Sequence, residues 1–73
     1  MVEINYYEVS NKNCTYGDEE FLTKTFSDVV PRAGELVGFE QFSDSYRVLD
    51  VSYWNSYPKS GFKCSVEILV YKE

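Results

Sequence analysis

The side chains of this 73-residue chain that could do chemistry are carboxylates, two arginines and a set of aromatic rings, because the sequence contains no histidine. Histidine is the commonest general base and metal ligand, so its absence removes every Ser-His or Cys-His nucleophile and most small enzymes. The neighbouring acids Asp18, Glu19 and Glu20 would point to alternate faces of a strand, and their spacing does not fit a calcium loop. The four glycines form no phosphate-binding pattern. We therefore expect no catalytic residues, no metal and no cofactor.

Arg32 and Arg47 are the only guanidinium groups in the chain, and a guanidinium can grip a carboxylate or a phosphate with two parallel hydrogen bonds. Together with Lys63 they would form a ligand-binding set for a nucleotide-like molecule, with aromatic rings from two protomers stacked on its base. The simpler interpretation is that Arg32 braces the turn from Pro31 to Glu35 and that Arg47 lies on an exposed strand face. The residue pattern favours the simpler interpretation and leaves the other open.

A loop rich in large rings is the sharpest feature of the carboxyl-terminal half. Tyr53, Trp54 and Tyr57 stand close to the rigid Pro58, and Phe62 follows them. Rings in a turn are less readily explained as core than rings in a strand, and Tyr and Trp make strong contacts at small entropic cost. The segment is either the packed lid of a barrel or a contact surface for a partner.

The charge balance is acidic, with 12 Asp and Glu against 7 Lys and Arg and a net charge of -5. Such a field repels polyanions, so we expect no direct nucleic-acid binding. Solubility alone would explain the excess, and an acidic surface that faces a basic groove of a partner is the sharper alternative. The acids that would form this surface are Glu19, Glu20, Asp28, Glu35, Glu40 and Asp44.

The two cysteines, Cys14 and Cys64, are 50 residues apart and match no local metal or redox motif. The amino-terminal residues have neither an apolar run nor a basic leader. We therefore expect free thiols, a cytoplasmic location in a bacterial host and no contact with a membrane.

Apolar and polar residues alternate with the period of two that is typical of half-buried strands. Turn residues separate the alternating segments at intervals of about 10 residues, which favours an all-β domain. The chain is short enough that residues 1–73 form a single domain. We expect a five-stranded SH3-like or OB-like barrel, or a strongly bent antiparallel sheet, because curling removes open strand edges. The expected strands are 2–9, 18–26, 36–39, 46–54 and 62–71.

Two details of this assignment are specific. Residues 18–27 favour a strand, but the acids ahead of Phe21 could also open a short helix, which would give an α+β fold. The apolar phase changes between Val48 and Val51, which is how a bulge at Leu49-Asp50 is expected to show in a sequence. Pro31 and Gly34 supply the geometry of a turn before the third strand.

The segments Val30–Val37, Tyr46–Tyr53 and Val66–Val70 together resemble a pattern found in short uncharacterised open reading frames of bacteria and their phages. The likeness covers residues 29–71 and implies a small β-barrel in a mobile-element setting, with no assigned activity. The chain departs from the pattern in its longer aromatic turn and its acidic amino-terminal segment, so a shared fold would not establish a shared partner.

Three functional hypotheses follow. The leading one is a non-enzymatic accessory protein of a phage or mobile element that occludes a host defence or regulatory protein through its acidic and aromatic surface. The second is a nucleotide-like ligand binder or sponge that acts as an oligomer. The third is a structural or assembly protein whose exposed strand edge pairs with a second copy.

Overall fold

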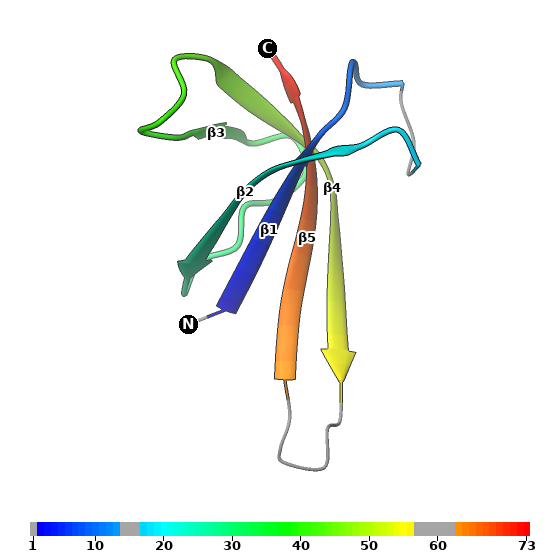
Figure 1. The fold of residues 1–73 in the computed structure, drawn as a ribbon, viewed down its shortest axis with the longest axis vertical. Coiled ribbons are helices and arrows are strands. Elements are labelled where there is room, and N and C mark those ends of the chain that lie inside the picture. Colours follow the sequence, from blue (N-terminus) through cyan, green and yellow to red (C-terminus); the bar gives the residue numbers. More distant parts are fainter. Residues whose placement is uncertain (1, 14–16, 57–62) are drawn as a thin grey trace.

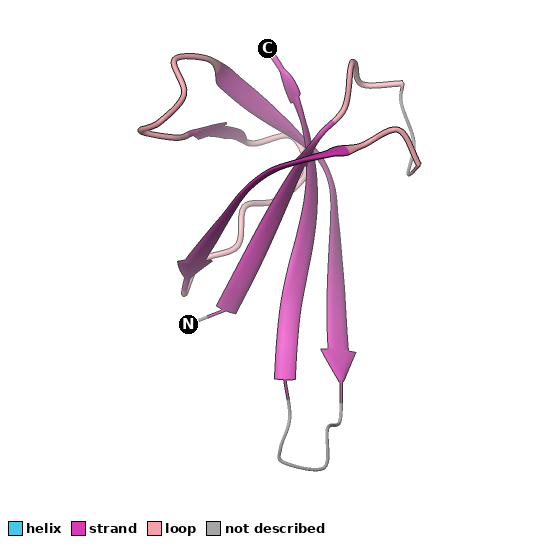
Figure 2. Ribbon diagram, viewed as in Figure 1, coloured by secondary structure: helices cyan, strands magenta, loops and turns pink. Residues whose placement is uncertain are grey.

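The computed structural model describes residues 2–13, 17–56 and 63–73, with the side chains of 55, 56 and 63 left out. This part of the chain contains no helix, so the all-β prediction is confirmed (Figures 1 and 2). Accordingly, the described residues include no helix long and apolar enough to cross a membrane. The strands are β1 (Val2–Glu8), β2 (Glu20–Ser27), β3 (Leu36–Gly38), β4 (Ser45–Ser56) and β5 (Lys63–Lys72).

The helical alternative for residues 18–27 is wrong. Thr23 and Thr25, which are stiff at the first side-chain torsion, alternate along β2 with larger side chains. The whole of β2 pairs antiparallel with β1, from Val2 opposite Ser27 to Glu8 opposite Glu20. The pairing with β1 supplies the partners for the backbone that a helix would otherwise satisfy internally.

The strands form one sheet in the order β2-β1-β5-β4-β3. β1 and β5 pair in parallel at the centre of this sheet, while the other neighbours are antiparallel. The sheet is strongly curled, as expected, and the strands fan apart toward one end (Figure 1). It remains an open half-barrel, however, and β2 and β3 are its edges. The open, curled form agrees with the strongly bent sheet that was expected as an alternative to a barrel. The parallel pair β1-β5 is the feature that the expected antiparallel sheet lacks.

The core lies on the inner face of the curled sheet. Directly opposite residues in paired strands point to the same face, and the row Tyr6-Ile68-Val51 runs across β1, β5 and β4 on this side. The residues buried together there come from these three strands and are Ile4, Tyr6, Tyr46, Val48, Val66, Ile68 and Val70. The opposite side of the same strands is called the outer face below.

The predicted bulge in β4 is confirmed. The pairing of β4 with β5 shifts register between Val48 and Asp50, which leaves Leu49 as the extra residue. Val48 and Val51 therefore both contribute to the inner face, although their spacing would place them on opposite faces of a regular strand.

A second bulge, in β2, has no counterpart in the sequence-based assignment. The pairing of β1 with β2 shifts register between Tyr6 and Tyr7, so that Thr23 faces Tyr6 and Phe21 faces Tyr7. The extra residue, Leu22, packs against the core. As a result Phe21 and Phe26, which are five positions apart, both point outward.

The connection between β3 and β4 covers part of the open inner face. The ring of Phe39 lies edge-on to Tyr6 at 4.8 Å and to Tyr46 at 5.7 Å between ring centroids. Gln41 reaches β2, where its amide Nε2 donates a hydrogen bond of 3.1 Å to Thr23 Oγ1. Aromatic rings and one side-chain hydrogen bond therefore bridge the gap that a closed barrel would fill with strand pairing.

The turn before β3 has the predicted position. Gly34 has a φ of 92°, in the region that glycine adopts without strain, and the N–H of Glu35 donates to Arg32 O at 3.1 Å. The Glu35 carboxylate closes the turn from the other side by accepting a 2.6 Å bond from the Arg32 backbone N–H. Cys64 is a half-buried free thiol, and Cys14 lies outside the described residues.

Candidate functional site

Three rows of side chains cross the outer face from β2 through β1 and β5 to β4, and we call them the outer-face patch. The rows follow from the strand register, because directly opposite residues share a face. From the end where the strands fan apart, they are Phe26-Glu3-Ser65-Trp54, Lys24-Asn5-Glu67-Ser52 and Phe21-Tyr7-Leu69-Asp50. Three strand spacings of about 4.8 Å make each row about 14 Å wide.

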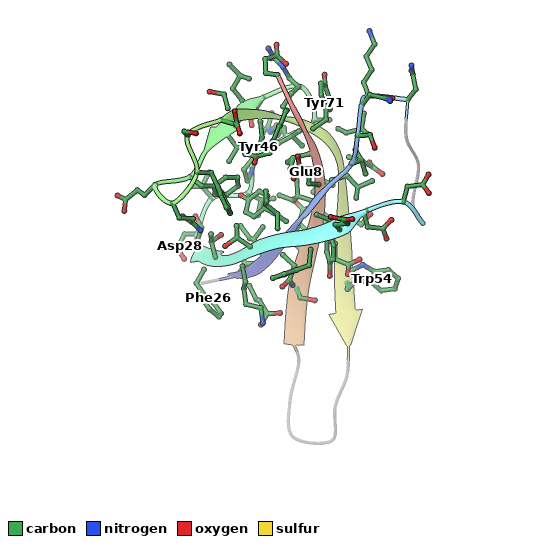
Figure 3. All side chains as sticks on the ribbon, turned by 45° about the horizontal axis from the view of Figure 1, so that its top comes forward. Glu8, Phe26, Asp28, Tyr46, Trp54 and Tyr71 are labelled. Atoms are coloured by element: carbon green, nitrogen blue, oxygen red, sulfur yellow. The ribbon has the colours of Figure 1, made fainter. Side chains whose placement is uncertain are left out.

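Large aromatic side chains on this patch are exposed to solvent. The exposed fractions of Phe21, Phe26 and Trp54 are 58%, 61% and 60%. Figure 3 shows Phe26 and Trp54 at opposite sides of the sheet, in line with their places at the two ends of one row. The solvent face of a half-buried strand ordinarily carries polar residues, so these rings do not serve the core of this domain.

Glu67 lies at the centre of the patch, where two aromatic residues bind its carboxylate. The indole Nε1 of Trp54 donates a hydrogen bond of 2.8 Å to Glu67 Oε1. The Tyr7 hydroxyl donates a longer one, 3.4 Å, to Glu67 Oε2. The Tyr7 ring in turn lies edge-on to Phe21, with 5.7 Å between ring centroids. Four residues from four different strands thus form one connected group.

The ionisation of Tyr7 reflects this position. Burial raises the pKa of the Tyr7 hydroxyl above its ordinary value of 10.0, and the negative charge of Glu67 and the hydrogen bond to it raise the pKa further. Burial, the charge of Glu67 and the hydrogen bond all favour the neutral hydroxyl, which is the form that can donate to Glu67.

The second carboxylate of the patch, Glu3, has a basic neighbour. Lys24 Nζ lies 3.7 Å from Glu3 Oε1, and the amide of Asn5 donates a 3.2 Å bond to Glu3 Oε2. Lys24 is the one base in the three rows, against the acids Glu3, Glu67 and Asp50. The patch is therefore acidic as well as aromatic.

Two of the rings predicted to bind a partner, Tyr53 and Trp54, lie on opposite faces of the sheet. Tyr53 and Trp54 are 59% and 60% exposed, but Tyr53 lies opposite Val66 on the inner side, whereas Trp54 lies opposite Ser65 on the outer side. Tyr57 and Phe62, which were expected to share their surface, lie outside the described residues.

The six acids expected to face a basic groove do not form one cluster in the structure. Glu19 and Glu20 lie at the start of β2, and Asp28 follows its other end. Asp44, in the connection between β3 and β4, is 3.4 Å from Lys72 Nζ. Glu35 is engaged in its own turn, and Glu40 is exposed in the same connection as Asp44. Their role in partner binding stays a prediction.

The two arginines have different surroundings. The guanidinium of Arg47 bonds to both carboxylate oxygens of Glu73, at 2.7 and 3.3 Å, and to Gly34 O at 2.7 Å. Arg32 instead lines a shallow hollow of about 270 Å³ beside β4, together with Tyr53 and Asp50. Arg47 does not line the hollow beside Arg32, and the side chain of Lys63 is not described. A shared ligand site for these three bases stays a prediction.

A second hollow, of about 240 Å³, lies where β1 meets β2 and is lined by Glu8, Val9, Ser10, Asp18 and Glu20. Glu8 and Glu20 are directly opposite each other. Within the described residues, no group of three or more His, Cys, Asp or Glu side chains is placed to hold a metal ion.

Sequence reasoning missed Tyr7, Phe21, Phe26, Glu3 and Glu67 as members of a common surface. A signal was present, because Tyr7 directly follows the inward-facing Tyr6 and so interrupts the alternation of apolar and polar residues. A ring in the solvent phase of a strand is a candidate member of a contact surface. Which rings share that surface depends on strand order and on the bulge in β2.

Comparison of this chain with known protein families, with curated protein sequences and with solved structures found no match.

Proposed function

We propose that this protein is a non-enzymatic binding protein that covers a basic surface of another protein with its outer-face patch. The observation that carries the proposal is the group of exposed rings, Phe21, Phe26 and Trp54, on one face of the sheet. Tyr, Trp and Phe are enriched at the buried centres of protein interfaces, where a few residues carry most of the binding energy. A partner seated on this face would remove the rings from water.

The charge of the patch supports a basic partner. Its three rows hold three acids and one base, and the whole chain carries a net charge of -5. Opposite charge on the partner would speed encounter and disfavour acidic competitors, including nucleic acids. The resemblance to short bacterial and phage reading frames implies a mobile-element setting, and for that setting we propose a host defence or regulatory protein as the one that is occluded.

The two faces of β4 provide a matched test. The immobilised protein is exposed to a bacterial lysate, and the retained proteins are compared between the wild type, Trp54→Ser and Tyr53→Ser. The two substitutions remove rings of nearly equal exposure from opposite faces. We expect one basic protein to be retained by the wild type and by Tyr53→Ser, and Trp54→Ser to weaken its binding about tenfold or more.

Salt adds an independent readout. Raising the salt concentration from about 50 mM to about 500 mM shortens the screening length severalfold and is expected to release the retained protein. Equal loss in both variants, retention of an acidic protein, or binding that salt does not change would contradict the proposal.

A second candidate function, binding of a nucleotide-like anion, is favoured by the hollow that brings Arg32 and the exposed Tyr53 together. A guanidinium and a ring could hold a phosphate and a base, although Asp50 in the same hollow would repel the phosphate. Thermal melting with a panel of nucleotides tests it, because a ligand of the folded state raises the melting temperature. The increase should disappear in Arg32→Gln, and a flat panel would remove this candidate for the ligands tried.

A further inference from the structure

We propose that Glu67, between Trp54 and Tyr7, is the receptor for an arginine side chain of the partner. This inference rests on the proposed function and names the group that the outer-face patch recognises.

Counted over the described residues, the carboxylate of Glu67 has two acceptor positions left. Each carboxylate oxygen can accept about two hydrogen bonds, and in the described part of the structure Oε1 accepts one from Trp54 and Oε2 accepts one from Tyr7. Two neighbouring oxygens, each with a remaining lone pair, match the two parallel N–H groups of a guanidinium. The existing bonds also fix the orientation of the carboxylate before a partner arrives, which reduces the entropy lost on binding.

The rings beside Glu67 favour the same ligand. Trp54 Nε1 is 2.8 Å from the carboxylate, so a group bound to Glu67 lies next to an indole that is 60% exposed. A guanidinium stacks on aromatic rings and is more weakly hydrated than the ammonium of lysine. Arginine therefore gains from both the charge and the rings, while lysine offers only a compact charge without the planar fork.

Three bases of the described chain form ion pairs with other carboxylates. Lys24 lies at Glu3, Arg47 at Glu73 and Lys72 at Asp44. Among the ion pairs between described residues, none includes Glu67. Glu67 is half-buried, and no described base is paired with it. An external cation would therefore be attracted to a negative charge that no described base already neutralises.

Trp54 provides the readout, because it is the only tryptophan in the chain. The full-length protein is titrated with three short neutral-ended peptides that differ at one position, which is arginine, lysine or the uncharged isostere citrulline. Tryptophan fluorescence follows binding at Glu67 directly. We expect the arginine peptide to change the fluorescence with a dissociation constant of about 1–10 mM, with weaker binding of lysine and no saturable change with citrulline.

Two variants locate the response. Glu67→Gln keeps the size and an acceptor oxygen but removes the charge, and should weaken the arginine peptide about tenfold or more. Glu73→Gln makes the same change at an exposed acid that pairs with Arg47, and it should leave the affinity for the arginine peptide unchanged. Unchanged binding to Glu67→Gln, or equal binding of arginine and citrulline, would overturn the inference. Thermal melting of each variant confirms that the protein is folded.

The outcomes separate this inference from the proposed function. If the basic partner is lost in Trp54→Ser but fully retained by Glu67→Gln, the function stands and the arginine receptor is wrong. If the arginine peptide binds at Glu67 while no partner depends on Trp54, the receptor stands and the proposed occlusion is wrong.

Discussion

The two faces of one sheet in this protein have opposite chemistry. On the inner face, aliphatic side chains and two tyrosines are buried together, and Val66, Ile68 and Val70 have no exposed surface. On the outer face, Phe21, Phe26 and Trp54 are more than half exposed. The half-buried carboxylate of Glu67 lies between Trp54 and the half-buried Tyr7. β5 contributes Ile68 to one face and Glu67 to the other, so a single strand serves both.

This difference separates stability from recognition. Burial of apolar surface on the inner face drives folding, at about 25 cal/mol for each Å² removed from water. Rings on the outer face keep most of their contact with water in the free protein, so their apolar surface contributes to the free energy of binding and little to that of folding. Substitutions on the inner face should therefore lower stability, whereas substitutions of the outer-face rings should weaken binding and change stability little.

The largest predicted effect comes from Ile68→Ala, which removes a fully buried side chain from the middle of the core. The lost burial and the cavity should lower the free energy of unfolding by about 2–5 kcal/mol, a large part of the total for a small domain. Phe26→Ala on the outer face should cost less than about 1 kcal/mol. Urea unfolding followed by circular dichroism measures both, and equal losses would break the distinction between the faces.

The next effect concerns the tyrosines, whose pKa values are raised on both faces. Burial raises the pKa of Tyr6 and Tyr46 on the inner face, whereas Tyr7 also responds to Glu67. Raised values favour the neutral form in the folded state, so stability is full below pH 10.0, the ordinary value, and declines as pH rises through the folded values. The ionisation of the tyrosines is measured by tyrosinate absorbance during an alkaline titration. The difference between the wild type and Tyr7→Phe gives the titration of Tyr7.

Glu67→Gln sharpens the comparison further. It should lower the pKa of Tyr7 toward its ordinary value, because the charge that opposes ionisation is gone, and should leave Tyr6 and Tyr46 unchanged. A shift in the pKa of all three tyrosines would show that Glu67 does not act on Tyr7 alone. A shift in none of them would show that Glu67 does not raise the pKa of Tyr7.

The smallest effect is expected at Glu73, which is exposed beside Arg47. The hydrogen bond from Arg47 lowers the pKa of Glu73 below its ordinary value of 4.5. The contribution to stability is therefore full above pH 4.5 and is lost as pH falls through the lower, folded value. Thermal melting between neutral and acid pH should show a slightly smaller acid-induced decrease in Glu73→Gln. An unchanged pH profile would mean that the pair of Arg47 and Glu73 does not contribute to the stability of the folded protein.

Much of the secondary structure was predictable from local patterns. Alternation indicated the strands around Ile4 and Ile68, and the change of phase after Val48 correctly indicated a bulge. Gly34 marked the turn that its φ of 92° confirms. The bulge at Leu22 was not predictable, because its sequence permits regular alternation and only the pairing with β1 shows the shift.

The patch was less accessible to sequence reasoning than the strands. Trp54 was proposed as a contact residue together with its neighbour Tyr53, but alternation along β4 puts the two on opposite faces. Its hydrogen-bond partner Glu67 is 13 positions away, and Tyr7 is 60 positions from Glu67. Nothing local relates residues at such separations.

The sequence by itself determined the all-β class, the turn at Gly34, the bulge after Val48, and an acidic chain without histidine. These properties depend on neighbouring residues or on sums over the whole chain, so local sterics and counting suffice. Only the tertiary structure decided that β1 lies beside β5 and that Tyr7, Glu67 and Trp54 meet. Strand order and register are set by burial of the whole inner face at once, and the same register fixes what gathers on the other side.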